Sequence, residues 1–184
     1  MTATSSHVGP HEKSRKSASA AVAPPTLDEL LALDTDALRE LYENAKTPSI
    51  SDLRGDLEGR MLTSPHGGET LARVMRSLAS LRQFPWRGKS FNPVSDTRGE
   101  GINRVFSDKN RWFRFETFIG PSRAGDFDAL QLDYDNRQNP AVIRAVKDEV
   151  RALAPGLFLG QAYVVVRGKA TLALYFALAS RGGA

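Results

Sequence analysis

Apolar residues follow a helical period in two segments of the chain before residue 82. In 26–45, Thr26 and Glu29 have the spacing of a capping box, and Asp34 has the position of a second N-cap. In 69–81, apolar residues recur three and four positions apart while arginines lie off that stripe. The pattern therefore predicts helices in both segments.

A third helical stripe follows a proline later in the chain. Asn139 has the position of an N-cap and Pro140 that of a first helical residue. The stripe over 140–153 consists of Val142, Ile143, Val146, Val150 and Leu153. Its charged residues, Lys147, Asp148, Glu149 and Arg151, then have the spacing of a solvated helix face. We therefore predict one helix inserted between strands.

The other segments after residue 84 have a period of two, which is typical of strands. The predicted strands are 86–91, 101–106, 111–119, 129–134, 157–166 and 170–178, with a further short one at 60–62. The short turn at 167–169 makes the last two a hairpin. Because most neighbours are joined by short loops, we expect antiparallel pairing in a sheet that curls to protect its edges.

These elements define the fold class as α+β. N-terminal helices would pack on a curved, mostly antiparallel β-barrel or half-barrel that carries one inserted helix. Residues 1–25 lack apolar periodicity and are rich in Ser, Ala, Lys and His, so we expect a disordered basic tail. Residues 26–184 would form a single domain, with a helical part at 26–82 and a barrel-like part at 84–184.

Composition removes several classes of function. The chain has 184 residues and no cysteine, which excludes disulfides and thiolate chemistry, and its three histidines form no metal-binding pattern. No apolar run has the roughly 18 residues of a membrane span, so we expect a cytoplasmic protein. The net charge is only +4, with basic residues scattered among acids, so we do not expect nucleic-acid binding. That alternative would rest on Arg87, Lys89, Arg104, Lys109, Arg111 and Arg114. The sequence assigns no cofactor and no oligomeric state.

Alternation along the strands indicates which side chains share a face. In 111–119, aromatic and charged residues occupy one face together, and polar residues alternate in the same way on neighbouring strands. Such a face is either the solvent side of the sheet or the lining of a partly polar cavity. For the cavity, the candidate ligand-binding residues are Trp86, Asn103, Trp112, Arg114, Phe118, Gln131, Gln161 and Tyr163.

A second hypothesis makes the same cavity an active site. A cofactor-independent lyase, isomerase or cyclase could use carboxylate and tyrosine acid–base chemistry in a dry pocket. Glu116 or Asp133 would then be the base, and Tyr163 or Tyr175 the proton donor or oxyanion partner. No phosphate-binding fingerprint and no Gly-x-Ser-x-Gly element is present in the sequence.

The element Trp86-Arg87-Gly88-Lys89, which opens the run of strands, resembles the start of a calycin or lipocalin-like barrel. The resemblance covers only the part after about Phe84, and the family's usual element is Gly-x-Trp, whereas Pro85 precedes Trp86 here. It implies a barrel that binds small hydrophobic molecules. We therefore expect a ligand that is largely apolar, with one polar or anionic end anchored by Arg114 and Tyr163.

Overall fold

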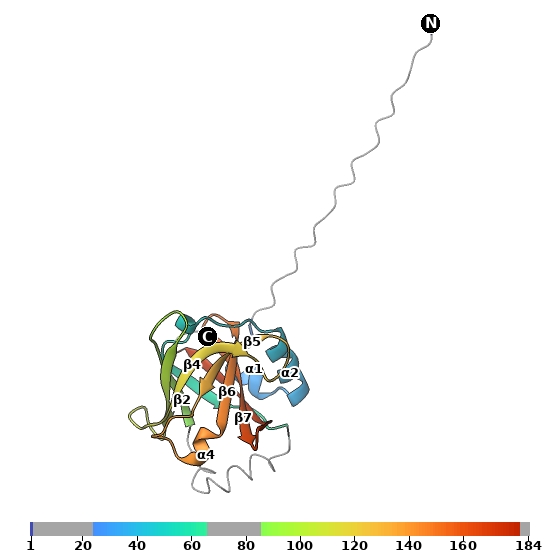
Figure 1. Cartoon of the computed structure of the whole chain (residues 1–184). Coiled ribbons are helices and arrows are strands. Elements are labelled where there is room, and N and C mark those ends of the chain that lie inside the picture. The colour runs from blue at the N-terminus through green and yellow to red at the C-terminus, as the bar shows by residue number, and fades with distance from the viewer. Residues whose placement is uncertain (2–23, 66–85, 181–184) are drawn as a thin grey trace.

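The computed structural model describes residues 1, 24–65 and 86–180 (Figure 1). In these residues eight strands form a closed barrel, in which each strand pairs antiparallel with its sequence neighbours and β1 pairs with β8. The strands are β1 (Gly55–Met61), β2 (Trp86–Pro93), β3 (Gly99–Val105), β4 (Arg111–Pro121), β5 (Asp128–Asp133), β6 (Val146–Ala154), β7 (Leu157–Val166) and β8 (Lys169–Ser180). The predicted barrel with antiparallel pairing is confirmed, and it is closed.

Short helices accompany the barrel. They are α1 (Leu27–Leu31), α2 (Thr35–Asn44), the 3-10 helix η1 (Ile50–Asp52) and α4 (Ala141–Arg144). The capping box of Thr26 and Glu29 is present, and the Asp34 side chain accepts a hydrogen bond from the Ala37 N–H, as the sequence predicted. Figure 1 shows α1 and α2 against one outer side of the barrel.

Two predictions fall on other parts of the chain. The helix predicted at 69–81 and most of the tail predicted at 1–25 lie outside the described residues. Among the helices that the structure describes, none has the length and apolar character of a transmembrane helix.

The helix predicted at 140–153 is wrong beyond its first turn. Only Ala141–Arg144 is helical, and Val146–Ala154 is strand β6, which pairs with both β5 and β7. The segment fits the period of two of a strand as well as the period of a helix. Val146, Asp148, Val150 and Ala152 face one side of the sheet, and the residues between them face the other. As a strand, the segment supplies the backbone hydrogen bonds that join β5 to β7.

The sheet forms the wall of the barrel, and clusters of buried apolar side chains lie on its inner and outer faces. The inner cluster lines the barrel interior with side chains from all around the sheet, including Leu57, Phe91, Phe115, Leu132 and Phe176. The outer cluster lies between the wall and the N-terminal helices, where Leu30, Leu38 and Tyr42 pack on Leu159 and Tyr175. The helices therefore cover β7 and β8 from outside, and the barrel has its own interior.

Glycines in the barrel wall make room for inner aromatic rings. A Cβ at Gly101 would overlap with the ring of Phe115, and one at Gly160 would overlap with the ring of Phe176. The rings therefore lie flat against the backbone of the neighbouring strand. An eight-stranded barrel is just wide enough for its side chains or for one small ligand, so each such ring decides how much interior space remains.

We predict that Gly101→Ala destabilises the protein by about 1 to 3 kcal/mol, the usual cost of forcing an extra methyl group against packed atoms. Gly120→Ala in β4 is the matched control, because a Cβ there meets its nearest atom at 3.4 Å, an ordinary contact. Urea unfolding of the two variants checks the difference. Equal stability of the two would show that the ring of Phe115 moves aside freely.

Candidate functional site

Four polar side chains from different strands meet inside the barrel. Lys89 of β2, Asn103 of β3 and Asp148 of β6 point inward, and Tyr134 follows the end of β5. The inward direction of Tyr134 is supported by Asn139, whose amide donates to the Tyr134 carbonyl at 2.9 Å. All four are buried, with at most 7% of their surface exposed. We call these four residues the inner polar cluster.

The cluster is held together by short hydrogen bonds. The Lys89 ammonium donates to Asp148 Oδ2 at 2.9 Å, to Asn103 Oδ1 at 2.9 Å and to the Tyr134 hydroxyl at 2.5 Å. The Tyr134 hydroxyl in turn donates to Asp148 Oδ2 at 2.9 Å. Asp148 thus bonds through one carboxylate oxygen, and its other oxygen, Oδ1, has no partner among the described residues.

Aromatic rings enclose the ammonium group of Lys89. Its nitrogen lies 5.2 to 5.4 Å from the ring centroids of Trp86, Phe115, Tyr134 and Phe176. Burial lowers the pKa of Lys89 below its ordinary value of 10.5, while the charge and hydrogen bond of Asp148 oppose that shift. Burial also raises the pKa of Tyr134, and the negative charge of Asp148 adds to this rise. The cluster is therefore an ion pair in a largely apolar, aromatic surrounding.

Irregular strand pairing occurs beside the cluster. The register shifts between Trp86 and Gly88, next to Lys89, and again at Asn103, where Phe113 has a φ of 59°. The Phe113 carbonyl accepts a hydrogen bond of 3.3 Å from the Asn103 amide. A third shift follows Ala162, which pairs with Asp148. Such bulges often lie beside functional sites, where they direct side chains.

The structure separates the residues that the sequence grouped as one ligand site. Trp86 and Asn103 lie inside the barrel and are joined by a 3.0 Å hydrogen bond from the Trp86 indole. Apart from Trp112 and Arg114, which are exposed on β4, the remaining candidates lie on the outer face in two cross-strand rows. One row holds Glu116, Asp133, Lys147 and Tyr163, and the next holds Phe118, Gln131, Glu149, Gln161 and Tyr175. Alternation placed these two rows on one face, but that face is the outer one, whereas Trp86 and Asn103 of the same predicted set lie inside the barrel.

Part of the outer face is buried beneath α2 and the segment after β4. There Glu149 is fully buried and accepts hydrogen bonds from the hydroxyls of Tyr42 at 3.1 Å and Ser122 at 2.7 Å. The Arg123 side chain donates to Glu149 at 3.1 Å and to Gln131 at 2.6 Å. The predicted residues Gln131, Gln161, Tyr163 and Tyr175 are all buried in this region. They hold the covering segments on the wall.

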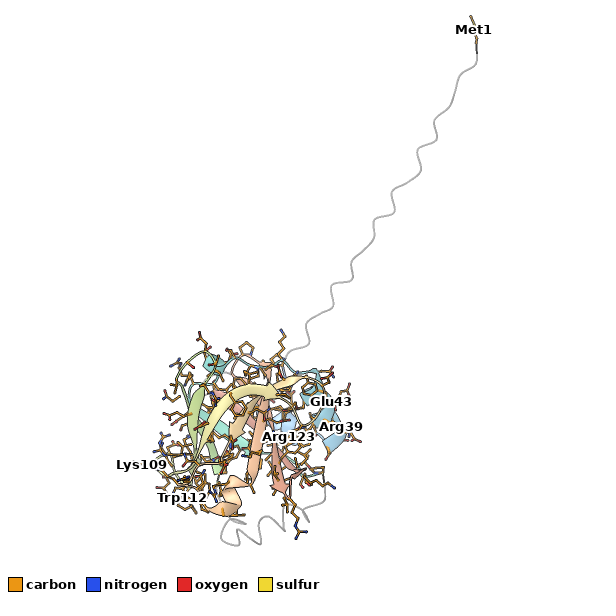
Figure 2. The ribbon with its side chains drawn as sticks, in the orientation of Figure 1. Met1, Arg39, Glu43, Lys109, Trp112 and Arg123 are labelled. Atoms are coloured by element: carbon orange, nitrogen blue, oxygen red, sulfur yellow. The ribbon has the colours of Figure 1, made fainter. Side chains whose placement is uncertain are left out.

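The charged members of the predicted site are exposed. Arg114 lies on the surface, and the Glu116 side chain, which is 70% exposed, forms a 3.8 Å ion pair with Arg98. Trp112 is 43% exposed and lies at one side of the molecule, whereas Arg123 lies nearer to α2 (Figure 2). Arg114 is thus exposed, whereas Tyr163 is buried beneath Arg123, whose guanidinium lies 5.7 Å from the Tyr163 ring centroid.

The proposed catalytic residues differ in exposure and in partners. Asp133 lies beside Glu116 on the outer face, and its carboxylate is paired with Lys147. Tyr163 donates to Gln161 at 2.6 Å and is buried with its neighbours, away from the exposed Glu116. The predicted solvated helix face is also wrong, because Asp148, Glu149 and Arg151 are buried on a strand.

Sequence reasoning did not include Lys89, Tyr134 or Asp148 in the binding site. Lys89 was named in the Trp86-Arg87-Gly88-Lys89 element and as part of a basic edge, and the edge is contradicted because the Lys89 side chain lies inside the barrel. Asp148 was hidden by the helical interpretation of 140–153. The signal that could have found it is the alternation of Val146, Asp148 and Val150, which places an acid between two inward apolar residues.

A hollow of about 680 Å³ lies outside the barrel, near the end of α2 and the β6–β7 turn. It is lined largely by Pro, Ala and Leu residues. Over 24–65 and 86–180, no group of three or more His, Asp or Glu residues has the arrangement of a metal site. The inner polar cluster is thus the strongest candidate site.

Comparisons with known proteins leave the function open. No family model matches the chain, and no curated protein matches it. Among solved structures, one titled "Crystal structure of protein from Thermomonospora curvata" is similar, with 17% identity and a TM-score of 0.48. The match covers 80% of this chain and 87% of that one. The resemblance to lipocalin-like barrels therefore stays a prediction.

Removing one partner of the Lys89–Asp148 ion pair should destabilise the protein far more than removing both. We predict that Asp148→Leu lowers the free energy of unfolding by about 3 to 5 kcal/mol, because Lys89 then keeps a buried charge without its counter-ion. The double variant Lys89→Met and Asp148→Leu should recover most of that loss, since apolar side chains replace the whole pair. Urea unfolding of both checks this. Equal losses would mean that the pair is not coupled.

The four buried tyrosines should make the free energy of unfolding depend on pH in the alkaline range. Burial raises the pKa of Tyr42, Tyr134, Tyr163 and Tyr175 above the ordinary value of 10. Above pH 10 the unfolded chain therefore loses protons that the folded chain keeps, which favours unfolding. Each tyrosine lowers the free energy of unfolding by about 1.4 kcal/mol per pH unit in that window.

Lys89 acts in the opposite direction, because its lowered pKa makes stability rise with pH up to about 10.5. The tyrosine effect is therefore measured above that pH, by phenolate absorbance with circular dichroism. We expect phenolate to form only as the protein unfolds. The urea-unfolded protein is the control, and it should titrate near pH 10. Phenolate in a protein with native dichroism would contradict the prediction.

Proposed function

We propose that the protein binds a small, largely apolar molecule inside the barrel, with the polar end of the ligand at the inner polar cluster. The observation that carries the proposal is the buried Lys89–Asp148 pair, in which Asp148 Oδ1 lacks a partner among the described residues. A buried polar atom without a partner costs about 1 to 3 kcal/mol, so a group that bonds it binds favourably.

A contribution to the stability of the fold does not explain why Lys89 and Asp148 are buried together. Taking two charges out of water costs several kcal/mol for each ion, and apolar residues of similar volume often stabilise a core as well or better. Buried titratable groups with shifted pKa values are instead frequent at functional sites. The three register shifts beside the cluster and the positive φ of Phe113 point in the same direction.

The cluster lies nearer to one end of the barrel than to the other. Lys89 and Asp148 lie near the starts of β2 and β6, and these strands begin at the same end because alternate strands run in the same direction. Val142 and Ile143 of α4 contribute apolar side chains to the inner cluster. At the other end, Ile50 of η1 and Leu53 pack on it. We therefore assign the polar end of the ligand to the α4 end of the barrel.

Trp86 offers a direct test of ligand binding, because its indole bonds to Asn103 of the cluster. The chain has two tryptophans, so Trp112→Phe leaves Trp86 as the single tryptophan reporter. Native mass spectrometry of the freshly purified protein should show an adduct that is lost on denaturation. Returning that compound to the ligand-free Trp112→Phe protein should change its fluorescence and raise its melting temperature by roughly 5 to 10 °C at a hundredfold excess over Kd.

The matched control is Trp86→Phe, which keeps only the half-exposed Trp112 as reporter. Its fluorescence should change much less on binding. A larger change at Trp112 than at Trp86 would place the ligand outside the barrel. Absence of any adduct, together with no stabilisation by a screen of apolar compounds, would contradict the binding proposal.

A further inference from the structure

The hydrogen-bonding groups of the inner polar cluster restrict the chemistry of the ligand's polar end. Each donor of the cluster has an acceptor. The three N–H groups of the Lys89 ammonium go to Asn103, Tyr134 and Asp148, and the Tyr134 hydroxyl goes to Asp148. The Asn103 amide donates to the Tyr134 hydroxyl at 3.2 Å and to the Phe113 carbonyl at 3.3 Å.

The neighbouring indole is used as well. The Trp86 N–H donates to Asn103 Oδ1, which it shares with Lys89. After these bonds, Asp148 Oδ1, an acceptor, is the side-chain atom of the cluster without a partner among the described residues. The cluster therefore has no spare donor for an anionic ligand end, and a ligand donor is needed to complete it.

The charges of Lys89 and Asp148 also disfavour an anionic end on the ligand. The Lys89 ammonium is already paired with the Asp148 carboxylate at 2.9 Å, so the two charges compensate each other. A carboxylate or phosphate on the ligand would face Asp148 Oδ1 and be repelled by it at low dielectric. An ammonium group on the ligand would add a second cation beside Lys89, within the same aromatic enclosure. A neutral donor avoids both costs.

Building on the proposed function, we propose that the ligand's polar end is a neutral hydroxyl or N–H group that donates a hydrogen bond to Asp148 Oδ1. This replaces the polar or anionic end anchored by Arg114 and Tyr163 that the sequence suggested. The apolar part of the ligand would then lie beside the rings of Trp86, Phe115 and Phe176, which surround the Lys89 end of the cluster.

Matched probes test the proposal without knowledge of the natural ligand. The pairs are 1-octanol with octyl methyl ether, and 2-naphthol with 2-methoxynaphthalene, so each pair differs in the donor. Octanoate, 2-naphthoate and octylammonium test the charged ends. Affinity is measured by the fluorescence of Trp86 in the Trp112→Phe protein. We expect each hydroxyl compound to bind about tenfold more tightly than its methyl ether and than the charged probes.

The double variant Lys89→Met and Asp148→Leu provides the control, because it removes the acceptor and the ion pair together. It should still bind the ethers and should lose the preference for the hydroxyl compounds. If the protein with Lys89 and Asp148 intact binds hydroxyl compounds and ethers equally well, the proposal is overturned. That result is expected where water or another part of the chain donates to Asp148 Oδ1. Tightest binding of an acid or of octylammonium would overturn it as well.

The outcomes distinguish this inference from the proposal on which it rests. If the ethers bind as well as the alcohols and Trp86 reports both, ligand binding in the barrel stands and the donor rule fails. If no probe in either series changes Trp86 fluorescence or the melting temperature, and no adduct is found by native mass spectrometry, both proposals fail together.

Discussion

The backbone hydrogen bonds of β6 join β5 to β7, and these bonds turn a curved sheet into a closed barrel. Closure defines an inside and an outside, and thereby decides which polar side chains meet. With 146–154 as a strand, Asp148 points to the interior and reaches Lys89. As a helix, the same residues would leave the sheet open between β5 and β7, and the inner polar cluster would lose its carboxylate.

Alternation could be read from the sequence because it depends on neighbouring residues alone. The strands at 157–166 and 170–178, the turn between them and the caps at Thr26 and Asp34 follow from such local rules and are confirmed. The side that faces inward is decided by the whole sheet. Polar residues such as Gln131 and Gln161 were assigned to a cavity, yet they are buried outside, where α2 and the segment after β4 cover them.

The segment after Pro140 shows a different limit. Its apolar residues fit a helical stripe, and Pro140 and Asn139 favour a helix start, so local signals agree on a helix. The structure keeps one turn of it, Ala141–Arg144, and then forms a strand. Pairing along both edges gives β6 a complete set of ladder partners and buries Asp148 and Glu149 against polar groups. Such long-range pairing has no signature in a window of 15 residues, so the alternation of Val146, Asp148 and Val150 could not by itself decide against the helix.

Adjacent residues of β6 link the inside of the barrel to its outer cover. Asp148 points inward to Lys89 and Tyr134, while Glu149, the next residue, points outward and is bonded by Tyr42 and Ser122. A strand that is anchored on both faces by buried carboxylates cannot twist or slip by one residue without breaking both sets of bonds. The outer contacts therefore hold Asp148 at a fixed position in the interior. Precise placement of this kind is what a small site needs, because a hydrogen bond to a ligand weakens steeply when its angle or length departs from the optimum.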